Sequence, residues 1–510
     1  MASFDKSNLL KNAYIGRKGY TILKSDLSTS MLKNVYTDLY AKPFTPINCG
    51  GGAQSEGFYC YRENTNKIYI PRFYGIEQFG IPEKNELIDN DCIESIDVEF
   101  TQSLRDYQEK IVNIYLEHCN KITNNDGKNY GNGGILEVPC GRGKTIMALN
   151  IISKLKVKTL VIVHKEFLMN QWIERIEAFL PSAKVGKIQG SVFDVEGKDI
   201  VIGMLQTLYI KDFKNNAFSH FGLTIVDEVH RIGSEQFSKA LFKAVTKYML
   251  GISATVERKD RLTHVLYMFI GPKIYHEERE KDDIVMVRAL HYKSNDPQFN
   301  EVELDFRGNT KHSTMISKLC EFGPRSDFIV KAIRDLIDEK STKQIMILGH
   351  NRNLLTYLYD SISHKGFATC GYYLGGMKQK DLQESETKQI VIATYAMAAE
   401  ALDIKTLSTL VMVTPKTDIT QSIGRILRVK HNNPIVVDIV DTHKNFTNQW
   451  YQRKRYYKKN GYYIYSANNT EYINMTETKW KAVYEPNDES VYKDDDEPMN
   501  EFGGKCTLTW

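Results

Sequence analysis

The sequence predicts an α/β protein with two doubly wound parallel-sheet lobes, preceded by a small α+β N-terminal domain. Two series of apolar runs alternate with helical segments, one over residues 133–255 and one over residues 344–440. The runs are rich in β-branched residues, as expected for parallel strands buried on both faces. Helices between successive runs supply the crossovers that parallel strands require, so each series predicts one lobe.

Changes of pattern divide the chain into four parts. Residues 1–98 hold a glycine-rich turn, NCGGGAQ, and two expected strands around the turn ENTN, and they form the N-terminal domain. The first lobe is expected over residues 99–285 and the second over residues 286–465, with charged sequence between the two series. Residues 466–510 are expected to be a C-terminal extension with an acidic, mobile tail.

Composition narrows the functional class. The 510 residues are 42% hydrophobic and 25% charged, which is typical of a soluble globular protein with a large core. There is no apolar run of 18 residues and no secretory signal pattern, so we expect an intracellular protein without a membrane span. The eight cysteines form no C-x-x-C pair, which argues against a zinc ribbon or a disulfide framework. Net charge is only +4, so a surface that binds a polyanion must come from local patches.

The segment VPCGRGKT, residues 138–145, has the features of a nucleotide-phosphate loop. Such a loop points backbone N–H groups into a concavity at a helix N-terminus and places a lysine over the phosphates. Gly141 and Gly143 permit the tight path, Lys144 supplies the charge and Thr145 can ligate Mg²⁺. Val138 replaces the first glycine of the usual pattern. The alternative is a plain strand-to-helix turn in which the threonine is a cap.

A second segment, LTIVDEVH, is an apolar strand that ends in two adjacent carboxylates. Asp227 is placed to hold Mg²⁺ through water, and Glu228 to polarise the attacking water. The carboxyl end of a strand is where an open α/β sheet binds its ligand. A solvated acidic turn is the alternative, but the position downstream of a GKT loop favours the catalytic interpretation.

A third segment, QSIGRILR, lies in the second lobe. Its arginines, Arg425 and Arg428, are three residues apart and share one helix face. Arginine forks can stabilise charge on a γ-phosphate during transfer. Alone the segment reads as an ordinary basic amphipathic helix, but its order behind the first two segments favours the functional interpretation.

Together these segments resemble the motifs of superfamily 2 helicases. The matching segments, in order along the chain, are LRDYQ, VPCGRGKT, VIVHKEFLMNQW, GMLQTL, VDEVH, SAT, ILGHN, IATYAMAAEALDI and QSIGRILR. The P-C-G-x-G-K-T form is similar to the XPB-like and UvsW-like branch, and the whole is similar to the helicases of large cytoplasmic DNA viruses, including the poxvirus transcript-release helicase and its asfarvirus and mimivirus-type relatives. The resemblance implies two RecA-like lobes.

The resemblance also implies roles for individual residues. ATP would be bound by Arg105, Gln108 (which would read adenine), Cys140, Gly141, Arg142, Gly143, Lys144 and Thr145. Catalysis would use Lys144, Asp227, Glu228, Gln421, Arg425 and Arg428, with Thr145 and Asp227 holding the metal. Coupling of hydrolysis to lobe movement would involve His230, Ser253 and Thr255. The nucleic-acid backbone would be tracked by His164, Lys165, Gln206, Thr207, His350, Asn351 and Thr394, although each of these is also a typical strand-end or cap residue.

Two departures from the family pattern and one further segment bear on the substrate. The box is D-E-V-H and not D-E-A-D, which argues against the RNA-remodelling DEAD-box group. Arg258, Lys259 and Asp260 stand where XPB-like proteins tend to carry Arg-Glu-Asp, which puts strand separation by this element in doubt; a solvated turn is the alternative. The stretch NQWYQRKRYYKKNGYY could bind nucleic acid through Arg453, its other basic residues and Trp450 or the tyrosines, or could pack its aromatics on the second lobe.

The sequence therefore predicts an ATP-driven, Mg²⁺-dependent nucleic-acid translocase in which the triphosphate lies between two lobes. Family likeness favours DNA, 3′-5′ movement and a role in viral transcription (transcript release or termination) or in DNA replication or repair. A monomer is expected, because nothing in the sequence demands more. The expected location is the host cytoplasm, at the viral factory, and also the virion, with viral transcription machinery as the expected protein partner. The rivals are an RNA helicase of viral messenger processing and a nucleic-acid-binding subunit of a larger transcription complex; a nuclease lacks a supporting carboxylate cluster outside the motor.

Overall fold

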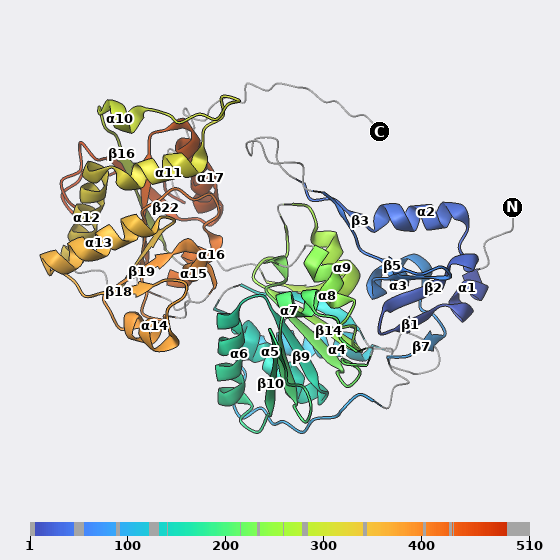
Figure 1. The fold of residues 1–510 in the computed structure, drawn as a ribbon. Coiled ribbons are helices and arrows are strands. Elements are labelled where there is room, and N and C mark those ends of the chain that lie inside the picture. The colour runs from blue at the N-terminus through green and yellow to red at the C-terminus, as the bar shows by residue number, and fades with distance from the viewer. Residues whose placement is uncertain are drawn as a thin grey trace. The chain divides into compact units, whose positions relative to one another are not determined.

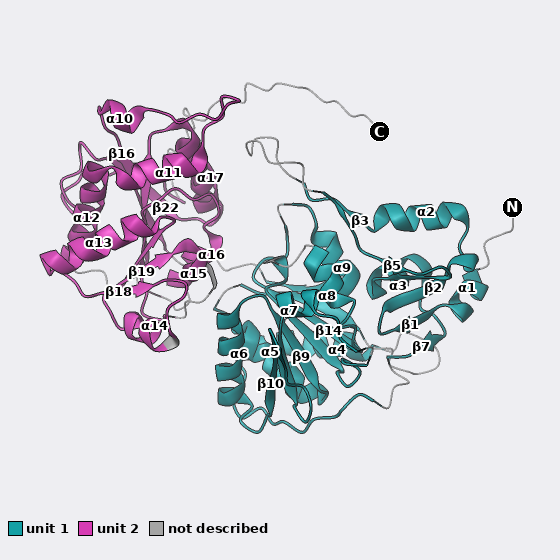
Figure 2. Ribbon diagram, viewed as in Figure 1, with its two compact units in different colours: residues 1–279 teal, residues 280–510 magenta. Residues whose placement is uncertain are grey.

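The computed structural model forms two compact units, residues 1–279 and residues 280–510, each described by itself (Figure 2). It describes residues 6–44, 56–87, 92–121, 132–139, 141–214, 216–231, 235–258, 260–277, 284–339, 344–400, 404–427, 431 and 433–486. The predicted glycine-rich turn, Cys140, Lys259, Arg428 and the acidic tail beyond residue 486 lie outside the described residues.

The first part of unit 1 is a small α+β layer around a five-stranded sheet of order β5-β6-β2-β1-β7 (Figure 1). Its strands are β1 (Tyr14–Gly16), β2 (Gly19–Leu23), β5 (Arg62–Glu63), β6 (Lys67–Ile70) and β7 (Lys84–Asn85). Its helices are α1 (Lys6–Asn12), the short 3₁₀ turn η1 (Lys24–Asp26), α2 (Thr29–Asp38) and α3 (Arg72–Phe79). A separate pair, β3 (Tyr40–Ala41) and β4 (Phe58–Tyr59), lies between α2 and β5. The predicted hairpin around ENTN is present, because β5 pairs antiparallel with β6.

The rest of unit 1 is an eight-stranded sheet of order β11-β10-β12-β9-β13-β14-β8-β15, which is parallel except for the β10–β11 pair. The strands are β8 (Gly133–Glu137), β9 (Thr159–Val163), β10 (Val185–Gln189), β11 (Val192–Phe193), β12 (Ile200–Met204), β13 (Leu223–Asp227), β14 (Tyr248–Ser253) and β15 (Lys273–His276). The helices are α4 (Asp106–Asn120), α5 (Lys144–Leu155), α6 (Glu166–Phe179), α7 (Leu205–Ile210), η2 (Val229–Arg231), α8 (Glu235–Leu241) and α9 (Thr263–Ile270). The order explains why the predicted runs are apolar throughout, since every interior strand is covered on both faces.

Successive residues of one strand enter different hydrophobic cores. Along β9, Leu160 and Ile162 join a core with α7, α8 and α9, whereas Val161 and Val163 join a core with α4, α5 and α6. A period of two along a strand places alternate side chains on opposite faces of the sheet. Unit 1 is therefore doubly wound, as the sequence predicts.

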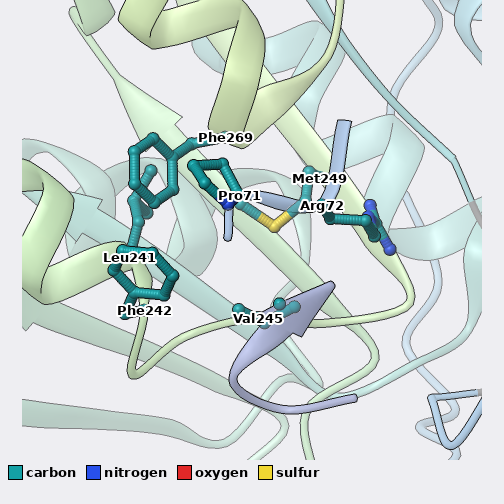
Figure 3. Close-up of a pocket in the computed structure, with 8 residues that line it drawn as sticks. Pro71, Arg72, Leu241, Phe242, Val245, Met249 and Phe269 are labelled. Atoms are coloured by element: carbon teal, nitrogen blue, oxygen red, sulfur yellow. The ribbon is translucent and has the colours of Figure 1, made fainter. Parts of the chain in front are cut away.

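The N-terminal layer shares the core that contains α8 and α9, and three arginines fasten it there. Buried Arg72 donates to the carbonyls of Thr246 and Lys247 at 2.9 and 3.0 Å. Arg17 donates to the carbonyls of Phe218 and Ser219, and Arg62 to that of Lys239. Pro71 and Arg72 line a cavity of only about 10 Å³ together with Leu241, Phe242, Val245, Met249 and Phe269. Figure 3 shows Pro71 among the side chains of the first lobe, with the Arg72 guanidinium pointing away from them. The predicted boundary near residue 98 thus separates two sheets but not two cores.

Unit 2 is built on an eight-stranded sheet of order β18-β19-β17-β20-β21-β16-β22-β23, parallel except for the β22–β23 pair. The strands are β16 (Met286–Tyr292), β17 (Ile345–Gly349), β18 (Cys370–Tyr373), β19 (Ile390–Thr394), β20 (Thr409–Met412), β21 (Ile435–Asp441), β22 (Tyr463–Asn468) and β23 (Lys481–Tyr484). The helices are α10 (Pro297–Asn300), α11 (His312–Glu321), α12 (Gly323–Asp338), α13 (Arg352–Lys365), α14 (Gln379–Glu386), α15 (Tyr395–Glu400), α16 (Thr420–Ile426) and α17 (Lys444–Lys459). The predicted fold class, two tandem doubly wound lobes with an N-terminal α+β part, is confirmed.

The sheet of unit 2 continues past the predicted end of the second lobe at residue 465. That position falls inside β22, and β23 adds a further antiparallel strand. Residues 466–486 therefore belong to the lobe and are not an extension from it. Within the described part of the chain, no helix has both the length and the hydrophobicity that a bilayer crossing needs.

Candidate functional site

The candidate nucleotide residues gather at one edge of the unit 1 sheet. Strands β13, β14 and β8 are neighbours, and each ends at a predicted motif. The register pairs Ser253 at the end of β14 with Glu137 at the end of β8, and the amide of Val138 donates to the Ser253 carbonyl at 2.9 Å. Because parallel strands share one carboxyl edge, the loop after β8, the carboxylates after β13 and the SAT segment after β14 lie together.

The loop after β8 has the backbone of a phosphate cradle. Gly141 and Gly143 have φ of +84° and +81°, a backbone region that residues other than glycine rarely adopt. A Cβ on Gly143 would lie 2.4 Å from the side-chain nitrogen of Gln108. Lys144 and Thr145 open α5, and the Lys144 ammonium reaches back to the Val138 carbonyl at 3.4 Å. Val138 itself is fully buried, so its larger side chain fills the core.

The predicted adenine-reading residues contact this loop. The Gln108 side chain accepts from the Arg105 amide at 3.0 Å, which caps α4, and donates to the Arg142 carbonyl at 3.0 Å. The Tyr107 hydroxyl donates to the same carbonyl at 3.3 Å, and the Arg142 guanidinium lies over the Tyr107 ring at 4.1 Å. The segment around Gln108 therefore fixes the path of the phosphate loop, and adenine recognition by Gln108 stays a prediction.

The carboxylates after β13 differ in their surroundings. Asp227 is buried and accepts from the Trp172 indole N–H at 2.9 Å. Burial and the neighbouring Glu228 raise the pKa of Asp227 to about 6, against the opposing effects of Trp172 and Lys144. Glu228 has a left-handed backbone, with φ of +52°. For a non-glycine residue this conformation is strained, and surrounding contacts must hold it.

The predicted coupling residues form one hydrogen-bonded group. His230 Nδ1 lies 2.7 Å from the Ser253 hydroxyl and 3.3 Å from a carboxylate oxygen of Glu228. The Ser253 hydroxyl donates to the Thr255 carbonyl at 2.6 Å. The DEVH segment and the SAT segment are thus in direct contact, so a movement of one displaces the other.

Sequence reasoning missed two carboxylates beside the phosphate loop, Glu277 directly after β15 and Glu137 at the end of β8. Glu277 accepts from the Arg142 side chain, with Nε to Oε1 at 2.8 Å. Glu137 accepts from Lys273 and from the Val256 amide, each at 2.8 Å, and lies 2.8 Å from a ring nitrogen of His276. Burial alone would raise the pKa of Glu137, but the contacts with Lys273, Val256 and His276 bring it below its ordinary value. No local sequence signal reveals these contacts, because the partners lie more than 100 residues apart.

The nucleic-acid candidates of unit 1 occupy neighbouring strand ends. The Gln206 side chain donates to the His164 carbonyl at 2.9 Å, joining the segments after β9 and β12. Lys165 is the N-cap residue of α6, and the Thr207 hydroxyl accepts from the Gly190 amide at 3.0 Å. Gln206 is exposed, whereas Thr207 is buried. The structure brings these residues together but also gives several of them local structural roles.

The candidates of unit 2 also combine clustering with local roles. Asn351 caps α13 by accepting from the amides of Asn353 and Leu354, and the Thr394 hydroxyl accepts from the Met397 amide at 3.4 Å. A ring nitrogen of His350 lies 3.0 Å from the Thr414 hydroxyl. Desolvation of the ring and then the charge of Lys416 lower the pKa of His350 to about 4, so the ring is neutral at pH 7.

The arginine helix of unit 2, α16, contains Gln421 and Arg425, and Arg425 is buried. The basic and aromatic stretch NQWYQRKRYYKKNGYY follows α16, and most of it belongs to α17. Its aromatic side chains pack on the lobe, which was the alternative to nucleic-acid binding. Trp450 and Tyr457 are buried, and Arg453 donates to Asp438 at 2.7 and 2.9 Å with both side chains buried. Arg453 is therefore unavailable to phosphates, which corrects its proposed role.

Comparison with known proteins identifies the family. A family model described as type III restriction enzyme, res subunit, matches residues 101–258. A protein of Acanthamoeba polyphaga mimivirus, named "Putative ATP-dependent RNA helicase", is 32% identical over 97% of both chains. The chain belongs to the superfamily 2 helicases of large DNA viruses.

More distant relatives of this chain are also named as helicases or translocases. An African swine fever virus protein, also named "Putative ATP-dependent RNA helicase", is 27% identical over 73% of this chain and 75% of its own. The "DNA 3′-5′ translocase XPB2" of Sulfurisphaera tokodaii is 24% identical over 70% of this chain and 87% of its own. A solved structure, S. cerevisiae Dbp5 bound to RNA and ADP BeF3, is similar at 13% identity and a TM-score of 0.48, covering 73% of this chain and 91% of that one. The names of the mimivirus and African swine fever virus relatives place the helicase among the ATP-dependent enzymes.

The residues at the strand edge suit a magnesium–nucleotide complex. Among the described residues, no group of three or more His, Cys, Asp or Glu side chains could hold a metal by itself. Mg²⁺ in such sites uses one or two protein groups together with substrate phosphates and water. The Asp227 carboxylate, which is buried at the end of β13, and the Thr145 hydroxyl in the first turn of α5 fit that requirement.

Proposed function

We propose that this helicase hydrolyses ATP at the carboxyl edge of the unit 1 sheet and uses the cycle to move along DNA. The observation that carries the proposal is the meeting of the phosphate loop, the buried Asp227 and the strained Glu228 at one sheet edge. Lys144 and the loop amides hold the phosphates, while Thr145 and Asp227 hold Mg²⁺, which when bound neutralises phosphate charge.

Glu228 is proposed to orient the attacking water and to accept its proton. Its carboxylate lies beside His230, which in turn contacts the SAT segment. Glu228 becomes neutral when it accepts that proton, and the contacts from Glu228 to His230 and from His230 to Ser253 are proposed to pass this change to the SAT segment. Gln421, Arg425 and Arg428 of unit 2 are proposed to stabilise the charge that develops on the transferred phosphoryl group.

DNA is favoured as the track by the D-E-V-H box and by the similarity to an archaeal DNA 3′-5′ translocase. The strand-end residues around His164, Gln206, His350 and Thr394 are proposed to contact its phosphates, and movement is proposed to run 3′-5′. Transcript release, termination, or replication and repair of viral DNA, at a cytoplasmic viral factory and with viral transcription proteins as partners, is the proposed setting. RNA remains a second candidate because the mimivirus relative is named an RNA helicase.

The test is ATPase turnover of the full chain with single-stranded DNA, duplex DNA and RNA of matched length. We expect the DNA substrates to stimulate turnover more than RNA; equal or stronger stimulation by RNA would transfer the proposal to an RNA helicase. Lys144→Ala and Glu228→Gln are expected to lower turnover by at least about 100-fold, since each removes a principal catalytic group. Wild-type turnover in either variant would contradict the assigned site.

A further inference from the structure

The segment that follows the SAT motif is held by the N-terminal layer. Directly after β3, the amide of Phe44 donates to the Asp260 carbonyl at 3.0 Å. The guanidinium of Arg261 lies over the Phe44 ring, 4.2 Å from its centroid. Arg261 has a left-handed backbone, with φ of +61°, so this turn depends on neighbours to hold it. The chain that follows β3 therefore reaches a segment that lies more than 200 residues further along the sequence.

The same turn contacts the DEVH motif through Arg258. Its guanidinium donates to the main-chain carbonyl of His230, and its Nε donates to an oxygen of Asp260 at 2.9 Å. The same Asp260 oxygen accepts from the Leu262 amide at 3.1 Å, which fixes the carboxylate in the turn. One planar guanidinium thus joins two segments, and a point charge such as an ammonium could not serve both contacts in this way.

Beyond His230 lies the proposed water-orienting group. His230 is two residues after Glu228 and contacts its carboxylate at 3.3 Å. Glu228 occupies an unfavourable backbone region, so the position of its carboxylate depends on what holds the DEVH turn. Arg258 holds that turn at the His230 carbonyl.

We propose that Arg258 is a positioning residue for ATP hydrolysis, and that Phe44 of the N-terminal layer sets its position through Asp260 and Arg261. The proposal rests on the function proposed above for Glu228. Because Arg258 holds the DEVH turn at the His230 carbonyl, its loss is expected to misplace the water-orienting carboxylate and to act on the chemical step of the reaction. The N-terminal layer thereby sets the turnover number of the motor.

The experiment measures kcat and KM for ATP with saturating nucleic acid in Arg258→Ala, Arg258→Lys, Phe44→Ala and the Phe44→Ala/Arg258→Ala double variant. We expect kcat to fall by about tenfold in Arg258→Ala and by about threefold in Phe44→Ala, with KM unchanged, because misplacement of a catalytic group acts on the chemical step. The double variant should match Arg258→Ala, since two residues of one contact series are not additive. Arg258→Lys should retain part of kcat through a single contact.

The matched control is Phe306→Ala in unit 2, where Arg307 lies over an exposed phenylalanine at 5.0 Å. It removes the same kind of contact and should leave kcat unchanged. Three results would each overturn the proposal. The first is a kcat within twofold of wild type in both Arg258 variants, and the second is a KM that rises in step with the fall in kcat. The third is a double variant in which the effects of the two single substitutions multiply. If Arg258→Ala does not fold, as judged by thermal unfolding, Arg258→Lys and Phe44→Ala decide by the same criteria. Lys144→Ala distinguishes failure of the proposed catalytic site from failure of the positioning role. Turnover in that variant would refute the catalytic site itself. An inactive Lys144→Ala together with normal Arg258 variants would refute only the positioning role.

Discussion

Replacing Gly143 by alanine tests the geometry of the phosphate loop. The residue has φ of +81°, and a methyl group would lie 2.4 Å from the side-chain nitrogen of Gln108. Alanine in this backbone region costs about 1 kcal/mol. The Gln108 side chain must also move away, and it then loses its bonds to the Arg105 amide and the Arg142 carbonyl. Each of those neutral hydrogen bonds contributes about 1 kcal/mol.

The total is about 3 kcal/mol if both bonds are lost and about 1 kcal/mol if Gln108 finds equivalent partners. Because nucleotide binding must restore the loop, ATP affinity should weaken by about 5- to 150-fold over that range. The assay is titration of the full chain with a fluorescent ATP analogue, together with KM from steady-state turnover. Gly197→Ala is the matched control, since Gly197 has φ of +63° with no atom within 4 Å of the added methyl.

Two results would refute this reasoning. One is an affinity of Gly143→Ala within twofold of wild type, which would mean that the loop does not need this geometry. The other is additivity with Gln108→Ala. If the methyl group acts by displacing Gln108, the double variant should bind ATP about as weakly as Gly143→Ala alone.

Two further predictions concern charged groups outside the catalytic residues. Glu137 has a lowered pKa, so its contacts stabilise the folded chain above the ordinary carboxyl pKa and that stability is lost as pH falls through the lowered value. Glu137→Gln should therefore lower the melting temperature at pH 7, and its difference from wild type should shrink as pH falls below the ordinary pKa of 4.5; a difference that does not change with pH would contradict this. Arg453→Ala leaves Asp438 charged and buried and should destabilise unit 2 by about 3–5 kcal/mol in urea unfolding. Lys459→Ala, exposed on the same helix, should change stability by less than about 0.5 kcal/mol, and similar losses in the two variants would remove the buried pair as the cause.

Much of the fold can be predicted from the local pattern of apolar and polar residues along the sequence. Runs such as TLVIVH and PIVVDIV became β9 and β21 because an interior parallel strand needs apolar side chains on both faces. Strand β16, MVRALHY, gave no such signal, since Arg288 interrupts the run. The two terminal nitrogens of the Arg288 guanidinium donate to the Glu339 carboxylate, each at 2.6 Å, and Glu339 lies 51 residues further along the chain. A charge inside a strand becomes acceptable only through such a distant partner, which local pattern does not reveal.

The site divides in the same way. The sequence predicts the motif residues because phosphate binding and water activation need particular chemical groups at particular strand ends. The contacts that hold them, such as Glu277 to Arg142, were not found because they join distant segments. For the buried face of α17 the sequence does carry a signal, since Trp450, Arg453 and Tyr457 are three and four residues apart and share one helix face. An arginine between two aromatics on one face indicates burial with an acidic partner.

The attachment of the N-terminal layer matters to anyone who shortens this chain for crystallisation or biochemistry. A fragment starting at residue 99 would contain every helicase motif and look like a complete motor. It would also uncover Leu241, Phe242 and Phe269, which now pack beside Pro71 and Arg72, and would leave the carbonyls of Thr246 and Lys247 without their donor. An exposed apolar surface of this kind promotes aggregation, so the smallest soluble fragment of the enzyme has to begin close to α1.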